Sequence, residues 1–502
     1  MTRRQFVGGG ASALAALAAS CTPSQTAEKQ QPHIVLLMGD DHGWEETGYN
    51  GHPFVKTPVL DEMASSGLRL DSFHSASPVC SPTRGSVMTG RHPNRYGTFA
   101  PGWSFRPEEI TIAQLLHDAG YACGHFGKWH LGAVKAESPL NPGAMGFDEW
   151  LSHDNFFEIN PTLSRNGAPP ERYEGESSEI VVNEAIRFID EQSQAGKPTF
   201  TVIWYGSPHE PYSGLPADLA LYDALPQSYQ EQSTTLTSME TGAQVQRPLR
   251  EVLRERYAEI TAMDRSIGKL RQHLADAGLR DNTLVWYCGD NGTPLSGQAG
   301  VSPLRGMKAD VYEGGTRVPG VIEWPARIGA PRTTDVNSVT SDTLPTLCDL
   351  VGIPLPSRPL DGISLKPLID GQMTERPTPI CFWNYDIAHE RAANLEPYLD
   401  PALQVGTTPL VKLMDGIATR NFVNFRHTEI TEQDYAGART ILDNRYKLVI
   451  DADAETELFD LRSDMGEKTN LIDSQPEAAA LQRQLRTWQE SVLHSLTGAD
   501  YA

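Results

Sequence analysis

Three short apolar runs, each followed closely by polar residues, limit the fold of this chain more than any other feature. The runs cover residues 34–38, 200–205 and 284–288, and the polar residues that follow them are Asp40 and Asp41, His209 and Glu210, and Asp290 and Asn291. Continuous apolar runs of this length are typical of strands buried on both faces, as in parallel sheets covered by helices. Ligands in such folds bind beyond the carboxyl ends of the strands. Three distant segments are therefore expected to meet at one site.

Helical patterns lie between the apolar runs and support this fold class. Apolar residues recur at helical spacing over residues 112–119, 180–189 and 251–277, and Gly120 and Gly278 follow the first and the last. Strands alternating with helices predict an α/β domain with a large, mostly parallel central sheet flanked by helices, over residues 32–375. The polar stretch 227–246 is expected to be a long loop near the site.

The pattern changes after about residue 376. Residues 445–450 and 457–461 are predicted to be two strands of a hairpin, and residues 476–493 a helix. We therefore predict that residues 376–502 form a smaller C-terminal subdomain, with an antiparallel sheet and a helix.

The first 31 residues are typical of an export signal and linker. Arg3 and Arg4 precede a weakly hydrophobic segment rich in Gly and Ala, as in twin-arginine signals, and Cys21 follows small residues as in a lipoprotein processing site. Export to the periplasm or cell envelope is expected. Lipid anchoring through Cys21 and ordinary cleavage after small residues both remain open.

Charge and cysteine content exclude several classes of function. The chain has 42 Lys and Arg against 64 Asp and Glu, a net charge of −22, which disfavours nucleic acid and anionic lipid as partners. An anionic substrate must therefore meet a local cluster of basic side chains. The remaining cysteines show no C-x-x-C pairing, so we expect buried thiols rather than a zinc site, with one disulfide left open; they are Cys123, Cys288, Cys348 and Cys381.

The most specific motif is C-x-P-x-R, formed by Cys80, Pro82 and Arg84. Five further blocks accompany it in order: G-D-D at 39–41, G-K-W-H-L-G at 127–132, P-H-x-P at 208–211, C-G-D-N-G at 288–292, and residues 304–319 around Lys308. From about residue 33 to 470 the chain resembles type I sulfatases of the alkaline phosphatase superfamily. In that family the cysteine of C-x-P-x-R is oxidised to formylglycine, which implies the same modification of Cys80.

A metal site is expected from the residue types alone. Asp40, Asp41, Asp290 and Asn291 offer only oxygen ligands, which suit a hard cation and favour Ca²⁺ over zinc, while Mg²⁺ remains open. The resemblance adds the modified Cys80 as a further contact of the metal.

The resemblance also implies roles for the other residues of the motifs. A hydroxyl of hydrated formylglycine, deprotonated with help from Asp290, attacks sulfur, and His130 later takes a proton from the second hydroxyl to expel sulfate. Positive charge would come from Arg84, Lys128 and Lys308. A proton for the departing oxygen would come from His209 or Lys308. Ser152 or His153 is a weaker candidate for a sulfate contact.

We therefore predict a sulfatase acting on a sulfated small molecule or glycan, with a sulfated carbohydrate as the expected substrate. A formylglycine-generating or radical maturation enzyme is the expected protein partner. Hydrolysis of phosphate or phosphonate esters, and non-catalytic binding of anionic glycans, are the alternatives. Substrate contacts are expected from residues 209–246 and 383–431, with these side chains as candidates: Trp383, Tyr385, His389, Arg391, Arg426 and His427.

Overall fold

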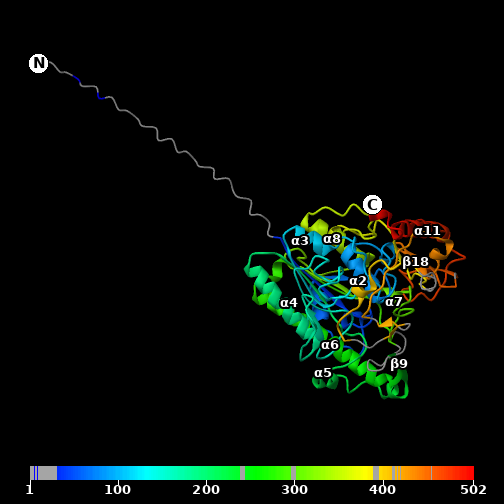
Figure 1. Cartoon of the computed structure of the whole chain (residues 1–502), viewed down its shortest axis with the longest axis horizontal. Helices are drawn as coiled ribbons and strands as arrows, with labels where there is room; N and C mark the ends of the chain where they lie inside the picture. The colour runs from blue at the N-terminus through cyan, green and yellow to red at the C-terminus, as the bar shows by residue number, and fades with distance from the viewer. Residues whose placement is uncertain are drawn as a thin grey trace. The chain divides into compact units, whose positions relative to one another are not determined.

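The computed structural model describes Gln5, Gly8 and residues 31–237, 243–295, 301–387, 395–409, 413–414, 417–418, 420–453 and 455–501. Residues 32–502 form one compact unit (Figure 1). The expected signal features, Arg3, Arg4 and Cys21, lie outside the described residues, as do His389 and Arg391. None of the described helices combines the length and the apolar character needed to span a bilayer. The boundary at residue 375 stays a prediction.

A ten-stranded sheet forms the centre of the protein. Its middle strands β11, β1, β8, β4 and β5 run parallel to one another, while β12 and β6 pair antiparallel on either side. The carboxyl ends of the five parallel strands therefore meet at one edge. In spatial order the strands are β13 (Arg332–Thr334), β2 (Leu68–Leu70), β12 (Gly320–Glu323), β11 (Thr283–Gly289), β1 (His33–Gly39), β8 (Thr199–Trp204), β4 (Ala122–Lys128), β5 (Glu149–His153), β6 (Thr162–Arg165) and β7 (Glu171–Arg172).

Helices cover both faces of this sheet, which confirms the predicted fold class. Alternate residues of β1 belong to two separate apolar clusters, Leu36 to one and Val35 to the other. The first cluster includes side chains of α2 (Cys80–Thr89), α3 (Ile112–Asp118) and α8 (Thr343–Val351). The second includes side chains of α1 (Pro58–Ser66), α4 (Ser177–Gln194) and α6 (Leu249–Asp276). Figure 1 shows α4 and α6 on the opposite side of the sheet from α2, α3 and α8.

A second, antiparallel sheet of four strands lies near the C-terminus, as predicted. Its order is β15 (Ile380–Trp383), β18 (Arg439–Leu442), β19 (Tyr446–Ile450) and β20 (Thr456–Asp460). Leu481 and Leu485 of α11 (Glu477–Leu496) pack against Leu448 and Leu458. On the other side, Val449 and Phe459 contact Val311, beside α7 (Glu313–Thr316).

The remaining elements are short. They are β3 (Phe73–His74) paired with β14 (Ser338–Val339), β16 (Leu413–Met414) paired with β17 (Ile417–Ala418), and the helices α5 (Pro216–Ala220) and α9 (Lys366–Ile369).

The prediction of a long loop over residues 227–246 is wrong. Strands β9 (Ser233–Thr237) and β10 (Gln244–Pro248) pair as an antiparallel hairpin. Thr234 and Leu236 are buried, whereas Ser233 and Thr235 are exposed, and Leu236 packs against Tyr229 and Tyr257. Threonine favours strands because its branched side chain fits a half-buried pleated surface, and this preference outweighs the polarity of the segment.

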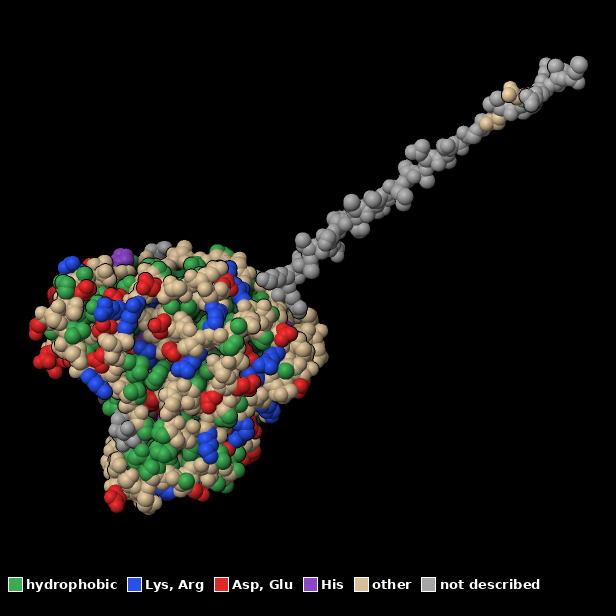
Figure 2. Space-filling view, turned by 180° about the vertical axis from the view of Figure 1, so that it is seen from behind, with side chains coloured by type: hydrophobic (Ala, Val, Ile, Leu, Met, Phe, Trp, Pro, Cys, Tyr) green, Lys and Arg blue, Asp and Glu red, His purple; other side chains and the backbone are tan. Residues whose placement is uncertain are grey.

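All five described cysteines are free thiols, and four of them are buried. On the face shown in Figure 2, acidic and basic side chains are intermixed rather than gathered into patches of one sign.

Candidate active site

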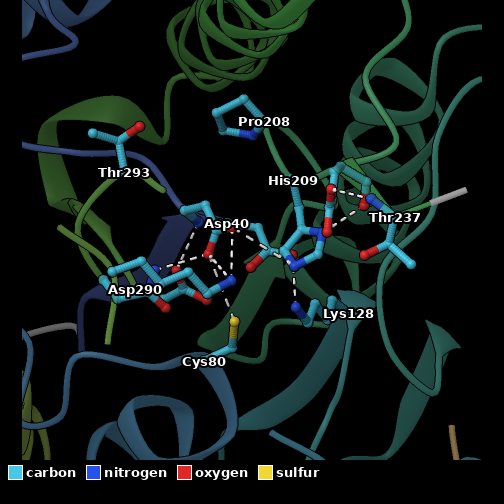
Figure 3. A network of polar contacts seen from close by, with 12 residues as sticks. Asp40, Cys80, Lys128, Pro208, His209, Thr237, Asp290 and Thr293 are labelled. Carbon is cyan, nitrogen blue, oxygen red and sulfur yellow. Dashed lines mark hydrogen bonds and ion pairs between the residues drawn. The ribbon is translucent and has the colours of Figure 1, made fainter. Parts of the chain in front are cut away.

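The predicted site residues meet at the carboxyl edge of the parallel strands (Figure 3). Asp40 and Asp41 follow β1, Asp290 follows β11, Lys128 ends β4, and His209 lies in the loop after β8. The backbone N–H of Asp41 donates to Asp290 Oδ1 at 2.8 Å, which joins the ends of two neighbouring strands. Asp41 has a φ of 62°, a left-handed conformation that is uncommon outside glycine and asparagine and often found at functional sites.

Cys80 is the first residue of α2, a helix in which every residue is buried. Its Sγ lies 3.7 Å from Asp41 Oδ1. Burial raises the pKa of the Cys80 thiol, because a thiolate is poorly solvated there and Asp290 and Asp40 add negative charge, although Lys128 and Lys308 act in the opposite direction. The unmodified thiol is therefore protonated and a poor nucleophile.

Arg84, one helical turn after Cys80, connects three strand ends. Its guanidinium donates to Asp290 Oδ2 through Nη2 at 2.7 Å and through Nε at 3.2 Å, and to the carbonyl oxygen of Lys128 at 3.2 Å. Nη2 also lies 3.3 Å from Asp40 Oδ1. Lys128 Nζ donates to the other oxygen of Asp40 at 2.7 Å, and both ion pairs are completely buried. These two cations hold the carboxylates in fixed positions.

Lys308 closes the site from the loop between β11 and α7. Its Nζ contacts both carboxylate oxygens of Asp41, at 2.6 and 2.7 Å. Although burial alone would raise the pKa of Asp41, the charges of Lys308 and His209 hold it well below its usual value. Lys308 is the most exposed of the three cations, at 19% of its side chain, so it can change partners when an anion enters.

His209 lies between two cis peptide bonds, Ser207–Pro208 and Glu210–Pro211. Its Nδ1 lies 2.6 Å from the carbonyl oxygen of Glu210, which makes Nδ1–H the donor and leaves Nε2 facing Asp41 Oδ2 at 3.6 Å. Burial lowers the pKa of His209 to about 3. The ring stacks on Phe156 with centroids 4.5 Å apart, which fixes the direction of Nε2 toward the carboxylate cluster.

His130 is buried, and neither of its ring nitrogens has a hydrogen-bond partner among the described residues. It follows β4 with a φ of 58°, and its backbone N–H donates to the carbonyl oxygen of Asp154 at 3.1 Å. Burial, together with the charges of Lys128 and Arg84, holds the pKa of His130 well below its usual value. Both nitrogens are thus available to exchange a proton with a ligand.

The residues present fit a divalent cation with oxygen ligands. Asn291 Oδ1 is buried without a hydrogen-bond partner in the described residues, while its Nδ2 donates to Asp41 Oδ1 at 2.8 Å. Ligand atoms of Asp40, Asp41, Cys80 and His209 lie within 4.8 Å of one another. Three carboxylates against Arg84, Lys128 and Lys308 leave no net charge, so the cluster attracts a sulfate strongly only when a cation is added.

The two weaker candidates differ in position. Ser152 is completely buried and its hydroxyl contacts His125 Nδ1 at 2.7 Å, so it points away from the cluster. His153 pairs in register with Lys128 and lies against Phe157, with ring centroids 5.7 Å apart. Trp383 and Tyr385, expected as substrate contacts, are buried in an aromatic cluster with Phe99 and Trp103.

Arg256 is a residue of the site that we did not predict. From α6 it donates to both carboxylate oxygens of Glu46 at 2.6 Å, and to the carbonyl oxygens of Asp41 and Pro208 at 2.5 Å each. It thereby fixes the loops that carry Asp41 and His209. An arginine directly before Tyr257, in the apolar stripe of residues 251–277, is the sequence signal that could have revealed it.

The α/β fold and the site define a hydrolase of the alkaline phosphatase superfamily. The family model Sulfatase matches residues 32–353, and the chain belongs to the sulfatase family.

Relatives agree with this assignment. N-acetylgalactosamine-6-sulfatase of Canis lupus familiaris is 32% identical over 387 residues, covering 69% of this chain and 68% of the relative. Arylsulfatase A of Bos taurus is 30% identical over 485 residues, covering 89% and 85%. Among solved structures, Ps i-CgsB in complex with k-i-k-neocarrahexaose has a TM-score of 0.71 at 22% identity, covering 92% of this chain and 93% of that one, which shows a shared fold.

Proposed function

We propose that this protein is an exported sulfatase that hydrolyses a sulfate ester of a carbohydrate, using formylglycine formed from Cys80 and a bound Ca²⁺ or Mg²⁺. The observation that carries the proposal is the position of Cys80. Its Sγ lies 3.7 Å from Asp41 within a closed set of three carboxylates and three cations. A cysteine with a raised pKa in such a place is useful only after conversion to a better nucleophile.

The ligands of the metal would be Asp40, Asp41, Asp290, Asn291 and residue 80. When bound, the metal would supply positive charge to the sulfate oxygens and to the nucleophile. Formylglycine would supply, as its hydrate, one hydroxyl for attack on sulfur and a second whose deprotonation re-forms the aldehyde C=O as the C–O bond to sulfate breaks.

The side chains of the cluster would bind and orient the substrate. Lys128 and Lys308 would hold the sulfate oxygens, and Arg84 would hold the side chain of residue 80 in position. The Lys308 ammonium, which contacts Asp41, could donate a proton to the departing alcohol, and His209 Nε2, 3.6 Å from Asp41 Oδ2, could do so once its ring has taken up a second proton. His130, whose two ring nitrogens find no partner in the described part of the chain, would accept the proton that accompanies release of sulfate.

Similar proteins support a carbohydrate as the substrate. One relative is named for a sulfated amino sugar, and the solved structure of similar fold contains a neocarrahexaose. The predicted signal at residues 1–31 supports export to the periplasm or envelope, with Cys21 as a candidate lipid attachment site. A formylglycine-generating or radical maturation enzyme would be required as a partner.

The test is mass spectrometry of the peptide containing residue 80, on protein produced together with a maturation enzyme, and turnover of an aryl sulfate by that protein and by Cys80→Ala. Conversion to the aldehyde, with turnover lost in the variant, supports the proposal. Matched aryl phosphate and phosphonate esters measure the alternative activity, and faster hydrolysis of the phosphonate would replace our assignment. Absence of any turnover in fully converted protein would favour a non-catalytic glycan-binding role.

A further inference from the structure

A recess of about 430 Å³ opens beside the proposed catalytic residues. His153, Phe156, Phe157 and Pro211 form the wall nearest the cluster, and Phe156 is the ring on which His209 stacks. Small-molecule sites in proteins have volumes of about 300 to 1,000 Å³ and are mostly apolar, with a few polar groups. Because His209 stacks on Phe156, which lines this recess, the alcohol side of a bound sulfate ester would project into it.

His153 presents a hydrogen-bond donor in this recess. The backbone N–H of Asn155 donates to His153 Nδ1 at 3.1 Å, so Nδ1 is the unprotonated nitrogen and Nε2 carries the hydrogen. Burial lowers the pKa of His153 to about 3, and the charges of Lys128 and Arg420 lower it as well. The ring is therefore a neutral donor under the influence of two cations, Lys128, which is already assigned to sulfate, and Arg420.

The second cation, Arg420, has no acidic partner within the described ranges. Its Nη1 donates to the carbonyl oxygen of Thr408 at 3.0 Å, and its Nε is buried without a hydrogen-bond partner there. Thr408 directly precedes Pro409, which lines the recess. Other arginines nearby differ, since Arg172 contacts Glu174 at 3.0 Å and Arg426 lies 3.9 Å from Glu396. In a chain with a net charge of −22, a partly buried cation without a carboxylate is suited to an anionic ligand.

The loop that holds Arg420 is itself fixed. The carboxylate of Asp154 accepts hydrogen bonds from the backbone N–H groups of Thr407 and Thr408, at 2.7 and 2.8 Å, and from the Thr408 hydroxyl at 2.7 Å. Asp154 also accepts from the backbone N–H of Val134 at 2.8 Å. Since Asp154 adjoins His153, the donor and the cation are held on one rigid support, which favours specific recognition over general attraction.

We propose that His153 and Arg420 bind a second anionic group, a carboxylate or another sulfate, on a sulfated saccharide whose sugar lies in the recess. The inference rests on the proposed function for the position of the first sulfate, at Lys128. It deepens that function by naming the substrate class: saccharides with two anionic groups, rather than simple monosulfated alcohols.

Binding to the full-length Cys80→Ala protein tests this without turnover. Calorimetry would compare three disaccharides: one with a single sulfate, one with a sulfate and a carboxylate, and one with two sulfates. We expect at least one of the doubly charged ligands to bind about tenfold or more tightly than the monosulfated one, because a charge-assisted pair in a partly buried site contributes that much. Whichever ligand gains identifies the second group as carboxylate or sulfate.

Arg420→Ala should remove most of this tenfold difference, and Arg420→Lys should keep part of it because it keeps the charge. Arg445→Ala is the control, since it removes the same charge from an arginine outside the recess that contacts Asp460 at 2.8 Å. The inference is overturned if the ratio between doubly and singly charged ligands is the same in Arg420→Ala and its parent, or if Arg445→Ala loses as much.

Failure of this inference is distinguishable from failure of the proposed function. Aryl sulfate hydrolysis by the converted wild-type protein, with no preference for doubly charged saccharides, would leave the sulfatase assignment standing and remove the second anion site. Absence of aryl sulfate hydrolysis would count against the proposed function, while the calorimetric ratios would still decide the role of Arg420.

Discussion

Replacement of Lys447 by methionine should destabilise the whole protein and weaken its activity. Lys447 is completely buried in β19, and its Nζ lies 2.9 Å from Glu313 Oε1 and 2.9 Å from Glu467 Oε1. In the variant, the Glu313 carboxylate still has its ion pair with Arg317 at 2.6 Å. Glu467, however, loses the only cation that contacts it among the described residues. Breaking a buried pair in this way costs about 3 to 5 kcal/mol, because an uncompensated charge remains.

The effect on the melting temperature follows from the size of the compact unit. Residues 32–502 form that unit, and unfolding entropies of about 2.1 cal/mol/K per residue give roughly 1 kcal/mol/K for it. We therefore expect a fall in Tm of about 3 to 5 °C, measured by scanning calorimetry at one fixed scan rate. Arg445→Met is the control, since Arg445 lies two residues away and contacts Asp460 at 2.8 Å in an exposed position; its Tm should hardly change.

Activity should fall in Lys447→Met because this ion cluster supports the loop that carries Lys308. Glu467 Oε2 accepts a hydrogen bond from the backbone N–H of Glu313, the first residue of α7, at 2.8 Å. Adding Glu467→Gln should recover part of the lost Tm, since it removes the unpaired charge. A single variant as stable as wild type, or a double variant with no recovery, would refute the reasoning.

Three further predictions follow from the site and its support. Removal of divalent cations with EDTA should lower Tm, and added Ca²⁺ or Mg²⁺ should restore it, because the cation separates buried carboxylates. Asp290→Asn should lose most of this response, and an unchanged Tm in wild type would argue against a metal site. Gly127 has a φ of 111°, and a side-chain carbon there would lie 1.9 Å from the Trp204 carbonyl oxygen, so Gly127→Ala should lower the free energy of unfolding by at least about 2 kcal/mol. Gly120→Ala should lower it less, because Gly120 has a φ of 90° but open space around it. Equal losses in the two variants would show that the contact with Trp204 is not the cause. Burial raises the pKa of Asp264 to about 7, so between about pH 4 and 7 the folded protein keeps a proton that the unfolded chain has lost, and the free energy of unfolding should decline as the pH rises through this range. Asp264→Asn should flatten that decline in denaturant titrations at several pH values. An unaltered slope of stability against pH would rule out Asp264 as its source.

The fold and the residues at the strand ends were predictable because both depend on local pattern. Continuous apolar runs identified β1, β8 and β11, and the rule that ligands bind at strand ends brought Asp40, His209 and Asp290 together. The hairpin of β9 and β10 was missed because alternating threonines in a polar stretch carry no strong hydrophobic signal. Which pairs form at long range, such as Lys447 with Glu313, is not encoded in any local pattern.

Support residues were the least predictable part of the site. Arg256 and Asp154 act through backbone carbonyl and N–H groups of distant loops, and such partners have no side-chain signature in sequence. The distinction between Ser152 and His153 likewise required the strand register, because adjacent residues of a strand point to opposite faces.

The burial of Cys80 bears on the order in which folding and the proposed oxidation of this residue can occur. Its side chain is enclosed once α2 has packed, with 1% of its surface exposed, so an enzyme that oxidises this residue must reach it before the catalytic unit closes. If Cys80 is oxidised as proposed, folding and modification would compete for the same nascent chain. The active fraction of a preparation should depend on how fast the protein is synthesised relative to the supply of the modifying enzyme, and a correctly folded molecule that missed the reaction would have no second opportunity without unfolding.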